Sequence, residues 1–251
     1  MKDAIVLEHV SKNFKRFAVS GQTTLKDAIL RGKIFQMGRS AGYVEALKDI
    51  SFSVPEATVL GIIGPNGAGK STLLRILAGI YRPTSGQVNV KGRISALLSL
   101  GLGFHPEFSG RENIIISGLA LGLSRKQVAD ISDDIIQFAE LEEFIDAPMR
   151  TYSSGMYMRL AFSVSVNINP DILLLDEVLA VGDASFAQKS RARMEEFKNS
   201  GKTIVLATHD LATVENWCQQ AIFLYGGQIC GFGKPKEVVA KYREIALGGP
   251  H

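Results

Sequence analysis

The chain alternates between short continuous apolar runs and longer segments in which apolar residues recur every three or four positions. The runs TVLGIIG (58–64), DILLLD (171–176) and TIVLA (203–207) are typical of strands buried on both faces of a parallel sheet. Helical spacing follows the first run, and a polar helix is expected between the other two. This order of elements predicts a doubly wound α/β sheet that is covered on both faces.

Other segments add parts to this core. Residues 4–14 and 47–54 read as strands near an edge, and 86–100 as short strands with glycine turns. Residues 110–146 have helical spacing throughout, which predicts an α-helical subdomain inserted into the α/β core.

Composition and charge narrow the class of protein only slightly. The 251 residues are 46% hydrophobic, which fits one globular domain with or without a subdomain. A net charge of +3 does not by itself argue for nucleic acid, and we expect none as a partner. Cys218 and Cys230 have no CxxC spacing, so neither a zinc site nor a disulfide framework is indicated, and reducing surroundings fit best. The start MKDAIVLEHV is too charged for a secretory leader, and no run approaches the roughly 18 apolar residues of a membrane span.

The first chemical motif follows the first buried strand. The segment GPNGAGKST matches G-x-x-x-x-G-K-[ST] between a predicted strand and a predicted helix, the context that a phosphate-binding loop (P-loop) requires. A glycine turn without a ligand is the alternative that this context disfavours. Backbone N–H groups of the loop can converge on phosphate oxygens. Lys70 would reach the β and γ phosphates as a catalytic group, and the Ser71 hydroxyl would ligate Mg²⁺. The expected nucleotide contacts are Gly64, Pro65, Asn66, Gly67, Ala68, Gly69, Lys70, Ser71 and Thr72.

Acidic residues close the second buried strand. Asp176 and Glu177 stand at its carboxyl end, the edge at which open α/β sheets bind ligands. Asp176 fits a Mg²⁺-holding role, and Glu177 fits the general base that activates the attacking water. A solvated acidic cap is the alternative. His209 closes the next strand and could reach the γ phosphate, although a lone histidine is more often structural.

With these motifs the chain resembles the ATP-binding cassette (ABC) ATPases over nearly its whole length. YSSGMYMRL stands where that family carries its signature motif LSGGQ, with Tyr152, Ser154 and Met156 as departures. The resemblance implies that Ser153, Ser154 and Gly155 bind the ATP held by the P-loop of a second copy. Donors at a helix N-terminus suit a phosphate oxyanion. The resemblance also makes Asp183 of AVGD a contact across the dimer and His209 the switch histidine.

Two functional residues of the family, a glutamine and an adenine-stacking aromatic, have no clear counterpart in this sequence. No glutamine occurs between Gln87 and Gln127, where the family usually has one that links the γ phosphate to the helical subdomain. His105 and Glu107 are the candidates to replace it. An aromatic ring after the first strand is expected to stack on adenine, with Phe14 the first choice and Tyr43 the second; plain core packing is the alternative for each.

Several phrases together, SALLSLGLGFHPEFSGREN, YSSGMYMRLAFSV and LDEVLAVGDASF, look like the polysaccharide-exporting branch of the family. The resemblance implies a single ABC ATP-binding domain over 1–251, with a helical subdomain at about 104–160 and a mixed, mainly parallel sheet beside an N-terminal antiparallel part. Some O-antigen members of this branch add a carbohydrate-binding domain after the ATPase; none is expected here, because the sequence stops soon after GFGKPKEVVAKYREIA. A basic insertion at 17–42 carries Lys26, Arg31, Lys33 and Arg39 against Asp27 alone, so it is expected to touch a membrane subunit or anionic lipid; a solvated loop is the alternative.

The function implied by this resemblance is ATP hydrolysis coupled to export. Two copies of the chain, with ATP and Mg²⁺, would pair with two copies of a polytopic membrane permease at the cytoplasmic face of the bacterial inner membrane. The cargo would be an undecaprenyl-pyrophosphate-linked glycan such as O-antigen of lipopolysaccharide, capsule or teichoic acid, handled indirectly and chosen by the permease. The alternatives are an ABC importer ATPase and a soluble, non-transport ABC ATPase.

Overall fold

The structure is a computed structural model that describes residues 2–15, 42–97, 104–176 and 183–248. Two predictions fall wholly or mainly outside the described residues: the general base Glu177 and the basic insertion at 17–42. Within the described residues, no helix combines the length and the apolar character that crossing a bilayer requires.

The larger sheet has six strands, of which neighbours run parallel except at one edge. In spatial order the strands are β5 (Ile94–Leu97), β6 (Ile172–Asp176), β7 (Thr203–Ala207), β3 (Val59–Ile63), β8 (Gln220–Tyr225) and β9 (Gln228–Gly233). Among the described strands of this larger sheet, β8 and β9 are the one antiparallel pair. Every residue of β3 and β7 is buried, as their continuous apolar runs predict.

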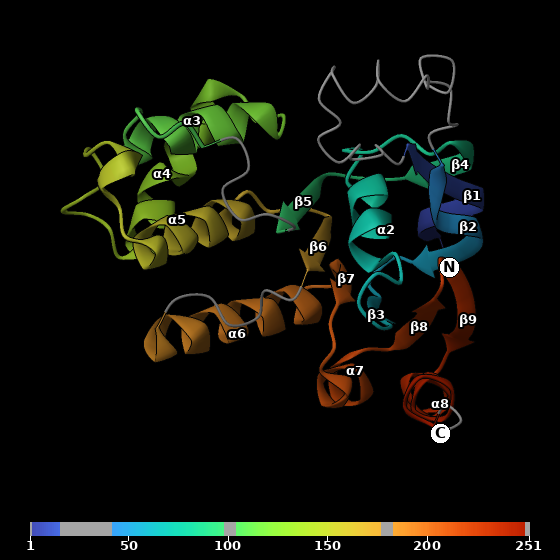
Figure 1. Cartoon of the computed structure of the whole chain (residues 1–251). Coiled ribbons are helices and arrows are strands. Elements are labelled where there is room, and N and C mark those ends of the chain that lie inside the picture. Colours follow the sequence, from blue (N-terminus) through green and yellow to red (C-terminus); the bar gives the residue numbers. More distant parts are fainter. Residues whose placement is uncertain (1, 16–41, 98–103, 177–182, 249–251) are drawn as a thin grey trace, which may run out of the picture.

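A second sheet of three antiparallel strands covers one face of the first. Its order is β2 (Tyr43–Pro55), β1 (Asp3–Lys15) and β4 (Ser85–Val90). Helix α2 (Lys70–Leu77) lies between the two sheets in one apolar core, to which Ile172, Leu174 and Val205 of the large sheet contribute. Figure 1 shows this arrangement on the right of the molecule.

The other face of the large sheet packs against helices α5 (Ser154–Asn167) and α6 (Ala184–Asn199). Leu173, Leu175 and Ile204 point to this side, alternating with the residues that face α2. Helices α7 (Leu211–Trp217) and α8 (Pro235–Tyr242) pack near β3 and β8, and a π-helical turn at Arg243–Leu247 follows. The prediction of a sheet covered on both faces is therefore confirmed.

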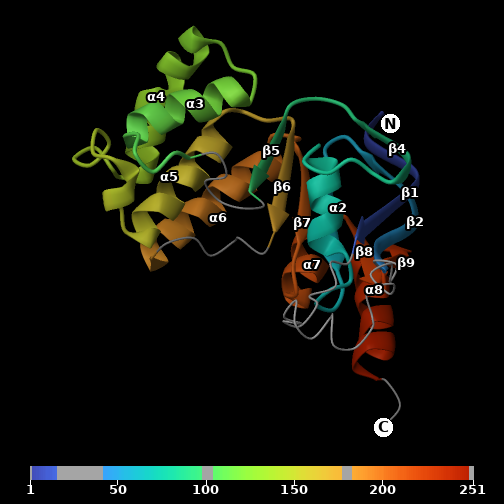
Figure 2. The ribbon, with the colours of Figure 1, turned by 45° about the horizontal axis from the view of Figure 1, so that its top comes forward.

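The helical subdomain projects from the edge of the sheet near β5 (Figures 1 and 2). It consists of α3 (Gly110–Ala120), α4 (Arg125–Ala139), a 3₁₀ turn (Met149–Thr151) and the first part of α5, around an apolar core of its own. Ser109 and Ser124 begin α3 and α4 with capping boxes. Helix α5 continues past residue 160 into the sheet layer, so it joins the subdomain to the core.

Candidate functional site

The P-loop connects the end of β3 to the start of α2. Gly64 has a φ of 155°, and a Cβ there would collide with the backbone carbonyl oxygen of Leu224. Gly69 has a φ of 108°, and a Cβ there would lie 2.6 Å from the carbonyl oxygen of Ala46. Both positions require glycine, because a side chain would meet backbone as well as a left-handed conformation.

A hollow of about 430 Å³ opens over this loop. It is lined by Val44, Glu45, Ala46, Asn66, Gly67, Ala68, Gly69, Lys70, Ser71, Thr72 and Asp176. Two residues predicted to hold Mg²⁺, Ser71 and Asp176, thus come from α2 and β6 to the same hollow. A hydroxyl and a carboxylate are the oxygen donors that Mg²⁺ prefers, so the residues present fit that ion.

Lys70 is folded back onto the loop that precedes it. Its ammonium nitrogen Nζ donates to the carbonyl oxygens of Gly64 at 2.7 Å and Pro65 at 3.2 Å, and the residue is buried. An ammonium has three donors, so these two bonds hold it at the centre of the loop and leave a third for a phosphate oxygen.

The two adenine candidates lie on opposite faces of the small sheet. In the register of β1 and β2, Phe14 is opposite Val44 and Lys15 is opposite Tyr43, so Phe14 shares a face with Val44, which lines the hollow. Tyr43 belongs to the other face and is 64% exposed. Phe14 also packs edge-to-face on Tyr81, with ring centroids 5.4 Å apart. Neither ring lines the hollow itself, and the register favours Phe14.

The signature residues lie in the helical subdomain, outside the lining of that hollow. Ser153 is the N-cap of α5, and its hydroxyl oxygen accepts a hydrogen bond from the backbone N–H of Met156 at 3.2 Å. This capping bond was not foreseen from the sequence. Ser153 and Ser154 are exposed and Gly155 is half-buried. They present hydroxyl and N–H donors outward from a helix N-terminus.

Asp183 stands at the start of α6, as Ser153 does at the start of α5. It is the N-cap of that helix, and its carboxylate accepts from the backbone N–H of Phe186 at 2.9 Å. An N-cap aspartate was not foreseen, although the order Asp-Ala-Ser-Phe before a helical pattern is a start signal that could have revealed it.

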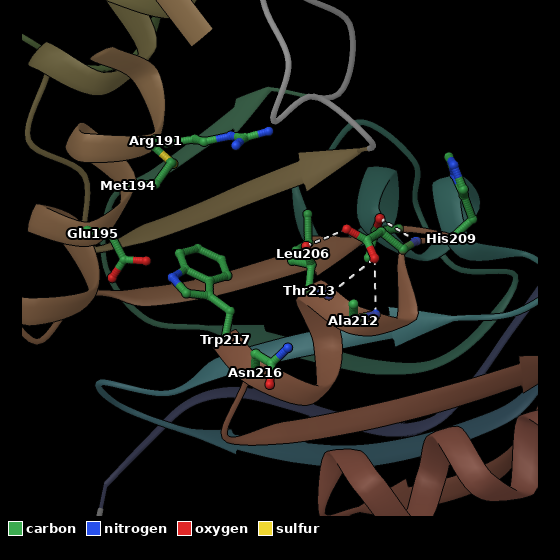
Figure 3. A pocket seen from close by; sticks show the side chains of 11 residues that line it. Arg191, Met194, Glu195, Leu206, His209, Ala212, Thr213, Asn216 and Trp217 are labelled. Carbon is green, nitrogen blue, oxygen red and sulfur yellow. Dashed lines mark hydrogen bonds between the residues drawn. The ribbon is translucent and has the colours of Figure 1, made fainter. Parts of the chain in front are cut away.

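His209 follows β7 and is exposed. It borders a second hollow of about 660 Å³ between α6 and α7, lined by Arg191, Met194, Glu195, Leu206, Thr208, His209, Asp210, Ala212, Thr213, Asn216 and Trp217. Figure 3 shows its imidazole directed away from the indole of Trp217. Since Asp176 is opposite Ala207 in the β6–β7 register, His209 and Asp176 leave the sheet from the same edge.

The residue after this histidine, Asp210, caps α7. Its carboxylate accepts hydrogen bonds from the hydroxyl and backbone N–H of Thr213, which lower the pKa of Asp210 below its usual value. The cap fixes the backbone on which His209 stands.

The candidates for the missing glutamine are held in a turn before α3. His105 stacks against Phe108 with ring centroids 4.5 Å apart, and the Glu107 carboxylate pairs with Arg150 at 3.1 Å. Asn113, which the sequence reasoning did not single out, organises this turn: it is fully buried, accepts from the backbone N–H of His105 and donates to three carbonyl oxygens.

A P-loop at the head of a short helix, an acidic strand end beside it and a helical subdomain with exposed N-terminal donors define a nucleotide-binding cassette of the P-loop class. Comparison with known proteins agrees. Residues 47–180 match the family model described as ABC transporter. The chain belongs to the ABC transporter family.

Three similar curated proteins are named as ATP-binding proteins of O-antigen or teichoic acid export. The chain is 55% identical over 246 residues to the O-antigen export system ATP-binding protein RfbB of Myxococcus xanthus, covering 96% of the chain and 56% of that protein. It is 42% identical to the teichoic acids export ATP-binding protein TagH of Bacillus cereus, covering 97% and 43%. It is 41% identical to the RfbB protein of Klebsiella pneumoniae, covering 97% and 99%. The chain thus spans about half the length of the first two relatives and nearly all of the third.

Solved structures bear out the fold. A dimeric ATP-binding cassette in a post-hydrolysis state, bound to ADP and phosphate, superposes with a TM-score of 0.71 at 22% identity, covering 92% of this chain and 98% of that one. The ATP-binding subunit of an ABC transporter superposes with a TM-score of 0.72 at 20% identity, covering 98% and 95%. The predicted fold class, a P-loop core with a mixed sheet, an antiparallel part and an inserted helical subdomain, is confirmed.

Proposed function

We propose that this chain is the ATP-hydrolysing subunit of an exporter that moves a lipid-linked polysaccharide across the cytoplasmic membrane. The observation that carries the proposal is the division of the site: Lys70, Ser71 and Asp176 share one hollow, while Ser153 faces outward from a different subdomain. One copy of the chain therefore carries two separate half-sites for phosphate. One is the hollow over the P-loop, and the other is the exposed start of α5.

Two copies facing each other head to tail would complete both sites. The P-loop of one copy would hold Mg-ATP, and Ser153, Ser154 and Gly155 of the other would bind the γ phosphate. The exposed hydroxyls and the backbone N–H groups at the start of α5 support this, because such donors stabilise a phosphate oxyanion from which water is excluded. Asp183, at the start of α6, would contact the partner copy. The similar cassette bound to ADP and phosphate is itself dimeric.

Within each site the residues have separate roles. Lys70 would bind the β and γ phosphates, Ser71 and Asp176 would hold Mg²⁺, and Phe14 would stack on adenine. Glu177, outside the described residues, would take the proton of the attacking water, and His209 would contact the γ phosphate from the next strand. The Mg²⁺ ion supplies charge neutralisation between the phosphates when it is bound.

The partner would be a polytopic permease, two copies of it, with the chain held peripherally at the cytoplasmic face of the membrane. The names of the relatives support export over import, since O-antigen and teichoic acid systems both move glycan outward. Closure of the ATPase dimer on ATP would be transmitted to the permease through the helical subdomain, because ATP stabilises the closed state more than the open one.

The Glu177→Gln variant tests the site. It should bind ATP as tightly as the wild type, lose most turnover and elute as a stable dimer in Mg-ATP, as measured by nucleotide binding, phosphate release and size-exclusion chromatography. Lys70→Ala is the matched control, which should lose ATP binding itself. Near-normal hydrolysis by Glu177→Gln, or a variant that stays monomeric in Mg-ATP with the permease present, would contradict the proposal.

The transport step needs the assembled complex. The chain purified with its membrane partner in vesicles should move an undecaprenyl-pyrophosphate-linked glycan only when ATP is hydrolysed. Uptake into inverted vesicles is measured by protection of the glycan from an added glycosidase. Glycan movement that continues in the Lys70→Ala complex would refute the coupling.

A further inference from the structure

A single glutamate, Glu140, ends helix α4 in an unusual backbone conformation. It is the C-cap residue, with φ 57° and ψ 50°, in the left-handed region that residues with a Cβ seldom adopt and that glycine or asparagine usually fills. The chain supplies neither of these. Strained residues persist where the surrounding structure holds them. The contacts of the Glu140 side chain should therefore explain why a glutamate stands at this position.

The Glu140 carboxylate pairs with cations from two different helices. One oxygen lies 3.3 Å from Nη1 of Arg159 on α5, and the other lies 3.0 Å from Nζ of Lys189 on α6. Each cation stands in the second turn of its helix, six residues after the N-cap residue, Ser153 or Asp183. Glu140 therefore joins the two helices whose N-cap residues are proposed to contact the partner copy.

An aromatic cluster lies beneath this pair of bridges. Phe138, Phe162 and Phe186 come from α4, α5 and α6, with ring centroids 5.8 to 6.2 Å apart. The Lys189 ammonium also sits 4.8 Å from the centroid of Phe138, and the Arg159 guanidinium 5.9 Å from that of Phe186. The three rings pack α4, α5 and α6 against one another. The two cations add directional contacts to the rings and to the Glu140 carboxylate.

We propose that Glu140 is a positioning residue: it fixes α5 relative to α6 and thereby the spacing between Ser153 and Asp183 at the dimer face. This inference rests on the proposed function, in which both residues contact the partner copy. Glu140 is about half exposed and Lys189 about one-third exposed. Ion pairs this exposed add little to stability. Removing the pair should therefore change the alignment of α5 and α6 more than the stability of the fold. Small displacements of groups that must meet a phosphate lower the rate steeply.

The test is Glu140→Gln in the full-length chain, compared with Glu143→Gln, an exposed carboxylate of the next turn. We expect Glu140→Gln to lower kcat by roughly three- to thirtyfold. ATP binding by the P-loop and the melting temperature should stay near wild-type values, because neither hollow nor core contains Glu140. Raising KCl should lower wild-type turnover toward that of the variant, since salt screens exposed charges.

A second variant separates alignment from general damage. Lys189→Gln should lower kcat as well, and the double variant with Glu140→Gln should lose less than the sum of the two single losses, because both single changes remove the same Glu140–Lys189 pair. Additive losses, a kcat within twofold of wild type, or a loss that follows a lowered melting temperature would each overturn the inference.

The same measurements distinguish this inference from the proposed function. If Ser153→Ala lowers turnover while Glu140→Gln does not, only the positioning role fails. If Ser153→Ala leaves turnover of the assembled complex unchanged, the shared nucleotide site fails and the positioning role fails with it.

Discussion

Ser153 serves two purposes with one hydroxyl. Its oxygen accepts from the backbone N–H of Met156 and so begins α5, while its hydrogen remains able to donate outward. Asp183 begins α6 in the same way, but its carboxylate can only accept. Of these two caps, Ser153 is therefore the one whose side chain suits a phosphate oxygen.

Substituting Ser153 separates the cap from the ligand contact. Ser153→Asp should keep the free energy of unfolding near the wild-type value, since aspartate caps helices as well as serine, yet abolish ATP turnover by placing a negative charge against the γ phosphate. Ser153→Ala should lose about 1 kcal/mol of stability together with turnover. Urea unfolding measures the stability and phosphate release measures the turnover. Normal turnover in Ser153→Asp would show that Ser153 does not contact the γ phosphate.

Cys218 gives a test at high pH. Burial raises the pKa of its thiol from 9.0 to about 12, with the nearby Lys198 opposing this effect. The folded chain therefore keeps the proton longer than the unfolded chain, so the stabilising contribution is complete below pH 9 and is lost as the pH rises toward 12. Urea unfolding at pH 8 and pH 10.5 should show a larger loss of stability in the wild type than in Cys218→Ala. Equal losses would mean that the thiol titrates normally.

At the scale of elements, local signals predicted most of what the structure contains. The strand, glycine loop and helix of the P-loop are fixed by neighbouring residues, so they could be found without knowing the rest of the fold. Strands β8 and β9 were overlooked, although Gly226 and Gly227 between two apolar runs are a hairpin signal. The sequence ranked Phe14 before Tyr43 but could not show that they lie on opposite faces, because this depends on the register of two strands that the insertion separates.

Helix α4 offers a test of the caps that the sequence encodes. Ser124 accepts from the backbone N–H of Gln127, and the Gln127 side chain accepts from that of Ser124. Ser124→Ala should therefore lower the free energy of unfolding by about 1 kcal/mol. Ser117→Ala, inside α3, is the matched control and should be neutral or slightly stabilising, because alanine is the better helix former. A neutral Ser124→Ala would show that packing alone holds the start of α4.

At the scale of the whole molecule, the arrangement of the subdomains explains why one copy is insufficient. The donors of α5 stand on a helical unit that projects from the sheet (Figure 2). No residue of α5 lines the hollow over the P-loop. The sequence could name both groups of residues by motif. It could not show that they lie apart in one copy, since separation in space follows from the packing of α5 between the subdomain core and the sheet.

We predict that the basic insertion at 17–42 contacts the membrane subunit or an anionic lipid surface. Lys26, Arg31, Lys33 and Arg39 stand against a single acidic residue, and each basic residue near an anionic bilayer contributes about 1 kcal/mol. Changing all four to glutamine should weaken co-sedimentation with vesicles that contain anionic lipid and reduce transport by the assembled complex, with ATP binding retained. The wild-type association should fall steeply with added salt, because screening acts on charge and leaves apolar contacts in place.

Four basic residues elsewhere provide the control for this experiment. Lys234, Lys236, Lys241 and Arg243 lie in or beside α8, on the far side of the core from the helical subdomain (Figure 1), and changing them to glutamine removes the same net charge. If attraction depended only on the total charge of the chain, both sets would weaken binding equally. A larger effect of the insertion set would locate the membrane-facing surface there, whereas full transport with unchanged membrane association would leave the insertion as a solvated loop.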